Sequence, residues 1–274
     1  MIKSRPFITR SEVPTNTRFI DCRFELQSKD DAAGHSAFLA GHIPGAVYAH
    51  LNDDLSGPIM TNQEGRHPMG RHPLPPVSTW WATLSHWGIN TNDVIVCYDD
   101  HNAAFAARAC WMLRQSGYEA YVLNGGFSAW QAAGGAIATE ALEYDTSDIP
   151  QPQPFKTINF KQLDTAGMLI DARANERYLG KIEPLDPIAG HIPGAMNQPF
   201  TDNFDSGYLK SEEQLRLIWE PLVSKNKQRT HYCGSGVTAC VNLLVLAQLG
   251  YDDDSLYAGS WSDWCSHQPL HYEA

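Results

Sequence analysis

Short apolar runs rich in β-branched and aromatic residues recur along both halves of the chain. Bounded by turn-forming residues, runs of this kind predict β-strands. They cover residues 18–21, 93–98 and 119–124 in the first half and 168–171, 229–233 and 254–258 in the second. Between the last two runs of each half the apolar positions follow a helical period, which predicts helices over Ala103–Ser116 and Val237–Gly250.

Strands that alternate with helices are typical of one fold class. The alternation predicts an α/β fold in which helices flank a parallel β-sheet on both faces. In such folds ligands bind at the carboxyl ends of the strands. Residues that directly follow a predicted strand are therefore the first candidates for a functional site.

The chain also repeats itself. The sequence FIDCR at 19–23 returns as LIDAR at 169–173, and GHIPGA at 41–46 returns unchanged at 190–195. Matches that recur in the same order indicate a duplicated domain.

The join between the two copies is marked by prolines. In TSDIPQPQP, at 146–154, they alternate with other residues and favour an extended linker. We therefore expect an N-terminal domain over residues 1–140, a linker over 141–155 and a C-terminal domain over 156–274.

Composition and charge exclude several classes of partner. Of the 274 residues, 43% are hydrophobic and 19% are charged, as in ordinary globular proteins. The net charge of −11 disfavours binding to nucleic acid or to an anionic membrane. No stretch approaches the roughly 18 apolar residues that a membrane span needs, and the start lacks an apolar signal region. We expect a cytoplasmic protein whose scattered cysteines form neither a disulfide framework nor a zinc site.

One cysteine has unusual surroundings. Cys233 follows a predicted strand and precedes Gly234, Ser235 and Gly236, after which a helix is predicted to begin. Such a turn directs successive backbone N–H groups inward, and these groups stabilise a thiolate together with the positive end of the helix dipole. The pattern predicts a nucleophile, and the alternative is a buried structural thiol.

The motifs GHIPGA in both halves, GGFSAW at 125–130 and CGSGVTA at 233–239 resemble those of the tandem-domain sulfurtransferases, the rhodanese and 3-mercaptopyruvate sulfurtransferase group. The resemblance implies two rhodanese-like domains, of which the C-terminal one carries the active cysteine, Cys233. This thiol would accept a sulfane sulfur from a small-molecule donor as a persulfide. It would pass the sulfur to a thiol, to thioredoxin or to cyanide, without a metal or an organic cofactor. The N-terminal copy would be catalytically silent, since Asp99 takes the place of the nucleophile.

The resemblance also implies a donor and the residues that bind it. Family members that prefer thiosulfate have two cations directly after the cysteine, whereas the mercaptopyruvate type has Gly-Ser, as here at Gly234 and Ser235. Arg177 matches an arginine that binds the substrate carboxylate. The family's second arginine is missing from the stretch GKIEPLDPIAG, at 180–190, where Lys181 could act as a point charge. The loop residues expected to contact the substrate are Gly234, Ser235, Gly236, Val237 and Thr238.

Proton transfer is implied for three further residues. Ser235 matches a loop serine of the family, His72 in GRHPLP matches its histidine, and Asp53 in HLNDDLSG matches its aspartate. A delivered proton would speed departure of the enolate that leaves the sulfur. His67 and Asp54 lie close enough in sequence to be alternatives to two of them.

Two rival functions belong to other classes. A cysteine phosphatase needs an arginine at the sixth position after the nucleophile, to clamp the phosphoryl oxygens, and that position is Ala239. A persulfide carrier without catalytic activity is the second rival. Within the sulfurtransferases, thiosulfate is the alternative donor.

Overall fold

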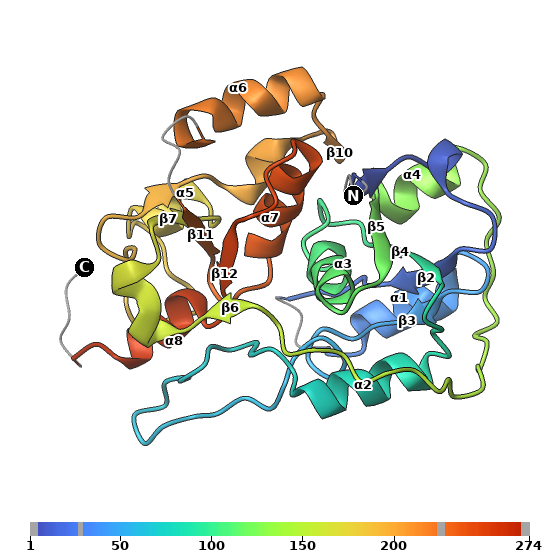
Figure 1. Ribbon diagram of the computed structural model, residues 1–274, viewed down its shortest axis with the longest axis horizontal. Coiled ribbons are helices and arrows are strands. Elements are labelled where there is room, and N and C mark those ends of the chain that lie inside the picture. The colour runs from blue at the N-terminus through green and yellow to red at the C-terminus, as the bar shows by residue number, and fades with distance from the viewer. Residues whose placement is uncertain (1–4, 27–29, 224–227, 270–274) are drawn as a thin grey trace. The chain divides into compact units, whose positions relative to one another are not determined.

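The computed structural model describes residues 5–26, 30–223 and 228–269 (Figure 1). The chain divides into two compact units. The N-terminal unit comprises Met1–Gly57, Pro75–Phe155 and Ser206–Leu209, and the C-terminal unit comprises Pro58–Leu74, Lys156–Asp205 and Lys210–Ala274. Residues 58–74, called the 58–74 segment below, thus pack with the second unit although they lie within the first half of the sequence.

The N-terminal unit is built on a five-stranded parallel sheet with the strand order β1-β5-β4-β2-β3. Its strands are β1 (Phe7–Ile8), β2 (Arg18–Asp21), β3 (Val47–Tyr48), β4 (Val94–Tyr98) and β5 (Glu119–Leu123). Its helices are the 3-10 helix η1 (Arg10–Glu12) and α1 (Ala33–Ala40), α2 (Val77–His86), α3 (Ala106–Gln115) and α4 (Gly126–Ala132).

The C-terminal unit repeats this arrangement, with the strand order β6-β12-β11-β7-β8 in a second five-stranded parallel sheet. Its sheet strands are β6 (Thr157–Ile158), β7 (Met168–Asp171), β8 (Met196–Asn197), β11 (Arg229–Tyr232) and β12 (Ser255–Tyr257). Its helices are η2 (Phe160–Thr165), α5 (Asn175–Tyr178), η3 (Phe200–Asn203), α6 (Glu212–Val223), α7 (Ala239–Gln248) and α8 (Ser260–Ser266). Two short strands, β9 (Phe204–Asp205) and β10 (Tyr208–Leu209), follow η3.

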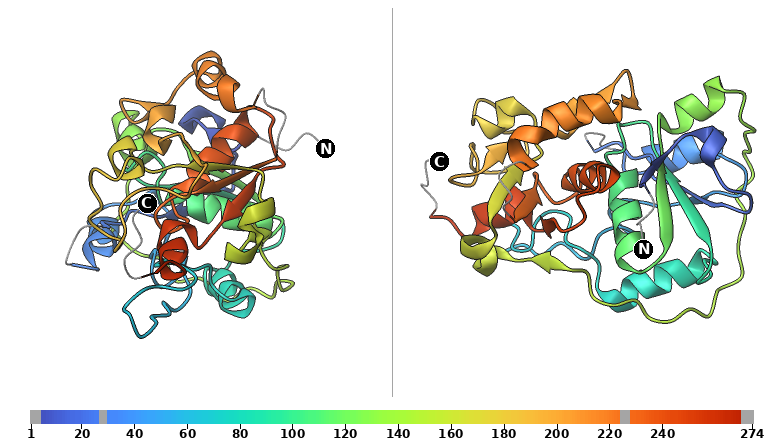
Figure 2. Two further views of the ribbon diagram at one scale, coloured as in Figure 1. Left: turned by 90° about the vertical axis from the view of Figure 1, so that its left-hand side faces the viewer. Right: turned by 45° about the horizontal axis from the view of Figure 1, so that its top comes forward.

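The predicted fold class is confirmed. Helices flank the strands in each unit (Figure 2), and every predicted strand is present to within one or two residues. Both predicted helices begin later than expected, α3 at Ala106 rather than Ala103 and α7 at Ala239 rather than Val237. The residues before each helix form a loop whose backbone turns away from helical geometry, as positive φ angles at Ala103 and Gly236 show.

The repeated motifs make the same contacts in both units. Tyr98 at the end of β4 accepts a hydrogen bond from the Ile43 backbone at 3.2 Å, and Tyr232 at the end of β11 accepts one from Ile192 at the same distance. Both tyrosines are fully buried in the apolar cores beneath the two sheets. The equivalent contacts explain why the GHIPGA motif recurs in both units.

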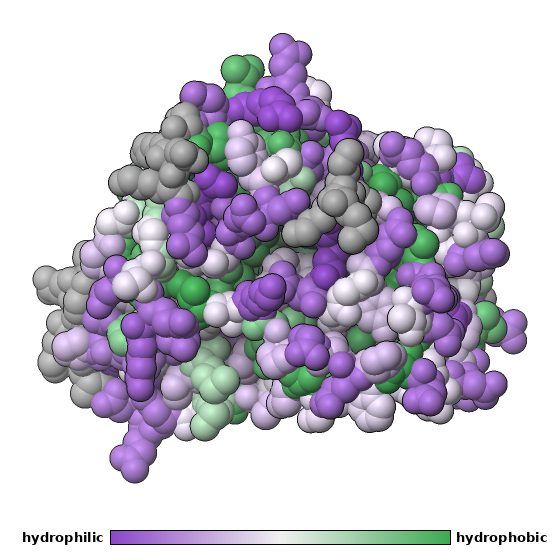
Figure 3. Space-filling view, in the orientation of Figure 1, coloured by the Kyte–Doolittle hydropathy of each residue, from purple (hydrophilic) through white to green (hydrophobic). Residues whose placement is uncertain are grey.

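The visible surface is largely hydrophilic. Figure 3 shows hydrophilic residues over much of the face turned to the viewer, interrupted by small hydrophobic groups. Among the described residues, none of the helices has both the length and the apolar character needed to cross a lipid bilayer.

Candidate active site

The loop that follows β11 holds Cys233 in a fixed turn. Cys233 is 2% exposed and comes directly after the strand, and α7 begins six residues later at Ala239. Gly236 has a φ of +77°, and any β-carbon there would collide with the carbonyl oxygen of Ala258. The turn therefore requires glycine at this position.

Helix α8 fixes the same loop from the other side. Its backbone N–H groups at Trp261 and Ser262 donate to the carbonyl oxygens of Cys233 and Gly234, each at 3.0 Å. The Cys233 N–H donates to Ser260 Oγ at 3.1 Å. These three hydrogen bonds to residues 260–262 hold the backbone around the thiol in place.

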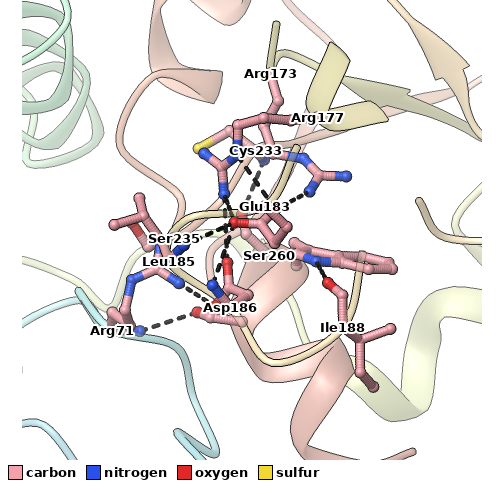
Figure 4. A network of polar contacts seen from close by, with 12 residues as sticks. Arg71, Arg173, Arg177, Glu183, Leu185, Asp186, Ile188, Cys233, Ser235 and Ser260 are labelled. Carbon is pink, nitrogen blue, oxygen red and sulfur yellow. Dashed lines mark hydrogen bonds and ion pairs between the residues drawn. The ribbon is translucent and has the colours of Figure 1, made fainter. Parts of the chain in front are cut away.

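Two guanidinium groups lie beside this loop. A methyl group added at Gly234 would lie 3.2 Å from Arg71 Nη2 and 3.3 Å from Arg177 Nη1. Arg177 comes from α5 and Arg71 from the 58–74 segment. Figure 4 shows Arg177 next to Cys233, and Asp186 in contact with both Arg177 and Arg71. Two arginines in this position are suited to binding an anionic group, because each presents a planar fork of N–H donors.

Two carboxylates pair with these arginines. Arg177 donates to Glu183 from Nε at 3.2 Å and from Nη2 at 2.6 Å. Asp186 forms an ion pair with Arg71 and lies 3.5 Å from Arg177 Nη2. Burial raises the pKa of the Asp186 carboxyl above its ordinary value, and the charge of Arg71 opposes that rise.

A histidine and a serine face each other close to the loop. His72 Nδ1 lies 2.7 Å from Ser235 Oγ, and the two residues are 7% and 6% exposed. A buried hydroxyl in hydrogen-bond contact with an imidazole is suited to relay a proton. Ser235 is also the second residue after Cys233, so the pair lies in the immediate neighbourhood of the thiol.

The 58–74 segment is anchored to the C-terminal unit by polar contacts along its length. Arg66 is 5% exposed and donates from Nη1 to the carbonyl oxygens of Cys265 and Gln268, at 2.8 Å and 2.6 Å. The Arg71 N–H donates to Ser262 Oγ at 3.0 Å. The anchors fix the backbone that carries both Arg71 and His72.

The predicted site residues fall into two groups. Cys233, the loop residues Gly234–Thr238, Arg177 and His72 all belong to the C-terminal unit. Asp53 belongs to the N-terminal unit, where its exposed carboxylate lies 3.1 Å from His50 Nδ1, and its catalytic role stays a prediction.

The sequence missed Arg71. The resemblance predicts a second arginine within residues 180–190, where the exposed Lys181 is the substitute that the sequence offers. The structure instead places a guanidinium from the 58–74 segment beside Gly234. The only signal in the sequence was its position directly before His72, which already matched a family motif.

The equivalent loop of the N-terminal unit is filled by its own side chain. Asp99 is 2% exposed and accepts four backbone N–H bonds, from His101 and Ala103 at Oδ1 and from Phe105 and Ala106 at Oδ2. Burial raises the pKa of this carboxyl, and the backbone donors lower it in part. The carboxylate therefore occupies a loop that still has the geometry of an anion-binding turn.

All six cysteines are free and buried. Among the described residues, no three His, Cys, Asp or Glu side chains form a group that could hold a metal ion. Burial raises the pKa of the Cys265 thiol to about 12, which makes it a poor nucleophile at neutral pH.

The fold and the loop define a class of protein, and the comparisons with known proteins agree. The model of the rhodanese-like domain matches the chain twice, over residues 10–133 and 158–267. The chain therefore belongs to the tandem-domain rhodanese family of sulfurtransferases.

Individual relatives differ in their named donors. A protein of Pseudomonas aeruginosa named "Probable 3-mercaptopyruvate sulfurtransferase" is 41% identical over 257 residues, which cover 89% of this chain and 88% of that protein. A Mycobacterium tuberculosis protein named "Putative thiosulfate sulfurtransferase SseB" is 37% identical, over 90% of this chain and 87% of its own. The solved 3-mercaptopyruvate sulfurtransferase of Leishmania major superposes with a TM-score of 0.85 at 31% identity. The superposed region covers 96% of this chain and 74% of the Leishmania major chain.

Proposed function

We propose that this sulfurtransferase takes a sulfane sulfur from 3-mercaptopyruvate and delivers it to a thiol, to thioredoxin or to cyanide. The observation that carries the proposal is the position of Arg71 and Arg177 beside Gly234, directly after the cysteine. Because Asp186 and Glu183 pair with these two guanidinium groups, they suit a singly charged donor whose carboxylate lies a few bonds from its sulfur. The named relative in Pseudomonas aeruginosa supports the same donor.

The first half-reaction forms a persulfide. Arg71 and Arg177 hold the carboxylate of mercaptopyruvate, and the Cys233 thiolate attacks the donor sulfur. A new S–S bond forms while the bond between sulfur and the donor carbon breaks. The electron pair of that bond leaves with the carbon as the enolate of pyruvate, and a proton converts the enolate to pyruvate.

Ser235 and His72 supply that proton. The imidazole lies within hydrogen-bond distance of the serine hydroxyl, so a proton given up by Ser235 toward the leaving enolate is replaced from His72. Backbone N–H groups of residues 234–238 stabilise the anionic sulfur before and after the transfer.

The second half-reaction restores the free thiolate. The sulfur or carbon nucleophile of the acceptor attacks the outer sulfur of the persulfide, and the S–S bond breaks with its electron pair on Cys233. The sequence of two half-reactions gives ping-pong kinetics.

Thiosulfate is the alternative donor, and the Mycobacterium tuberculosis relative carries that name. A persulfide carrier is the alternative outside enzyme catalysis. The test is a side-by-side measurement of kcat/KM with mercaptopyruvate and with thiosulfate, using cyanide as the acceptor. The proposal expects mercaptopyruvate to be the more efficient donor. A preference of about tenfold or more for thiosulfate, which is about 1.4 kcal/mol, would assign the protein to the thiosulfate enzymes.

A further inference from the structure

We propose that Asp186 sets the net charge of the donor site and thereby selects a singly charged donor over a doubly charged one. The inference rests on the proposed function and adds a residue that determines its specificity. It concerns a side chain that contacts both arginines of the site.

Both guanidinium groups contact the carboxylates and also lie beside the loop. Arg71 turns Nη1 to Asp186 and Nη2 to Gly234, while Arg177 turns Nη2 to Asp186 and Glu183 and has both Nη1 and Nη2 beside Gly234. The Asp186 side chain is only 1% exposed, so it is held between these partners and not in solvent (Figure 4). Asp186 thus leaves the loop-facing nitrogens of both arginines directed at the place where a donor binds.

The charges of this cluster cancel. Arg177 pairs with Glu183 and Arg71 pairs with Asp186, so two positive and two negative groups lie together. The neighbouring Arg173 pairs with Asp171 at 2.6 Å and shares Glu183 with Arg177, at 3.1 Å, so a third cation and a third carboxylate join the cluster. Because every guanidinium in the cluster has a carboxylate, the site offers no excess positive charge from side chains.

An electrically neutral site discriminates between donors by their charge. One carboxylate brings a single negative charge, which the loop N–H groups and the shared arginines accommodate. Thiosulfate brings two, and uncompensated charge in a buried place is unfavourable. Asp186 therefore disfavours the dianion more than the monoanion.

Asp186 also keeps the two guanidinium groups close to each other. Without it their mutual repulsion would rise, and both donors would be bound less well. A loss of positioning lowers kcat/KM for both donors alike, whereas a change in net charge alters their ratio. The ratio therefore separates a role of Asp186 in donor specificity from a role in positioning the two guanidinium groups.

The experiment compares the wild type with Asp186→Asn, with kcat/KM for thiosulfate and for mercaptopyruvate. The ratio of thiosulfate to mercaptopyruvate should rise at least about tenfold, which is about 1.4 kcal/mol. Asp186→Glu keeps the charge and should leave the ratio within about threefold of the wild type, whatever happens to the absolute rates. Asp252→Asn removes one charge at an exposed position of the same unit and should leave the ratio unchanged.

A second measurement uses the wild type alone and does not depend on the folding of a variant. Pyruvate and sulfate are tested as inhibitors, since one is a monoanion and the other a dianion. The inhibition constant of sulfate should be at least about tenfold weaker than that of pyruvate.

The outcomes distinguish the inference from the proposed function. A wild type active with mercaptopyruvate whose ratio stays the same in Asp186→Asn overturns the inference and leaves the proposed function intact. Sulfate that inhibits as well as pyruvate also overturns it. A wild type that uses neither donor refutes the proposed function and the inference with it.

Discussion

Arg71 and Arg177 reach Gly234 from two segments that are about a hundred residues apart in sequence, the 58–74 segment and α5. If both bind the donor carboxylate, Arg71→Ala should raise KM for mercaptopyruvate about tenfold to a hundredfold, because a charge-assisted hydrogen bond contributes about 1.5–3 kcal/mol. Lys181→Ala is the matched control, since Lys181 is a cation on the same unit but is exposed. Steady-state kinetics in which Lys181→Ala raises KM and Arg71→Ala does not would reverse the assignment.

The contact between Ser235 and His72 predicts an effect on turnover rather than on binding. Ser235→Ala should lower kcat about a hundredfold, the range expected for loss of a general acid, and should change KM less than about threefold. Ser128→Ala, on the exposed side of α4, is the control. An unchanged kcat in Ser235→Ala would show that the enolate takes its proton from elsewhere.

For single residues, the sequence predicted the reactive group more readily than it predicted which distant side chains lie beside that group. Cys233 was predicted from its own surroundings, because glycines and a following helix mark the turn directly. Arg71 was missed because Gly234 and Asp186, which it contacts, are distant in sequence. The residues next to an arginine in sequence do not indicate which loop its guanidinium group will contact.

The 58–74 segment acts as an element that carries part of the site. Arg66 binds two backbone carbonyl groups at the end of α8 and thereby fixes the segment that bears Arg71 and His72. Arg66→Ala should lower kcat/KM about tenfold or more, by loosening these two residues without touching the donor. Arg216→Ala, which removes an exposed arginine of α6, is the control.

A positioning role for Arg66 has a signature that general destabilisation lacks. In the Arg66→Ala background, Ser235→Ala should cost much less than in the wild type, because His72 no longer holds the serine. If the losses of activation free energy in the two single variants simply add in the double variant, as they do for independent sites, the segment is not coupled to the serine.

At the scale of elements the sequence predicted the strands well and the helix starts less well. Apolar β-branched runs such as Val94–Tyr98 define a buried strand with little ambiguity. The predicted starts of α3 and α7 are too early because alanine and valine before Ala106 and Ala239 continue a helical composition. The loops there are instead determined by hydrogen bonds to the backbone, which an apolar pattern does not record.

The molecule contains two copies of one fold, and the loop that carries Cys233 in one copy carries Asp99 in the other. In the N-terminal copy the Asp99 carboxylate accepts four backbone N–H bonds. Asp99→Asn should destabilise that unit by about 1–3 kcal/mol, because an amide N–H₂ group would face backbone donors that lack an acceptor. The change in kcat/KM should stay below about threefold, because we expect this loop to take no part in sulfur transfer.

Thermal unfolding and steady-state kinetics of the same preparation test both halves of that expectation. A lowered midpoint with nearly unchanged kinetics fits a structural role for Asp99. A hundredfold loss of kcat/KM in folded protein would mean that the N-terminal loop contributes to the chemistry.

The duplication and the fold class could be predicted at this scale because repeated motifs keep their order along the chain. The membership of the 58–74 segment in the second unit could not, since it has neither a strand nor a helix and its contacts are made by single side chains such as Arg66. Sequence order placed the segment in the first half, and packing placed it in the second unit.

The central claim is that Cys233 carries the transferred sulfur. Intact-mass analysis of the wild type after exposure to mercaptopyruvate, without an acceptor, tests it directly, followed by peptide mapping. The account predicts one added sulfur atom per chain, located on the peptide that contains Cys233 and absent from Cys233→Ser, with release of the sulfur when cyanide is added. An added sulfur on another cysteine, or an unchanged mass in protein that still turns over mercaptopyruvate, would contradict it.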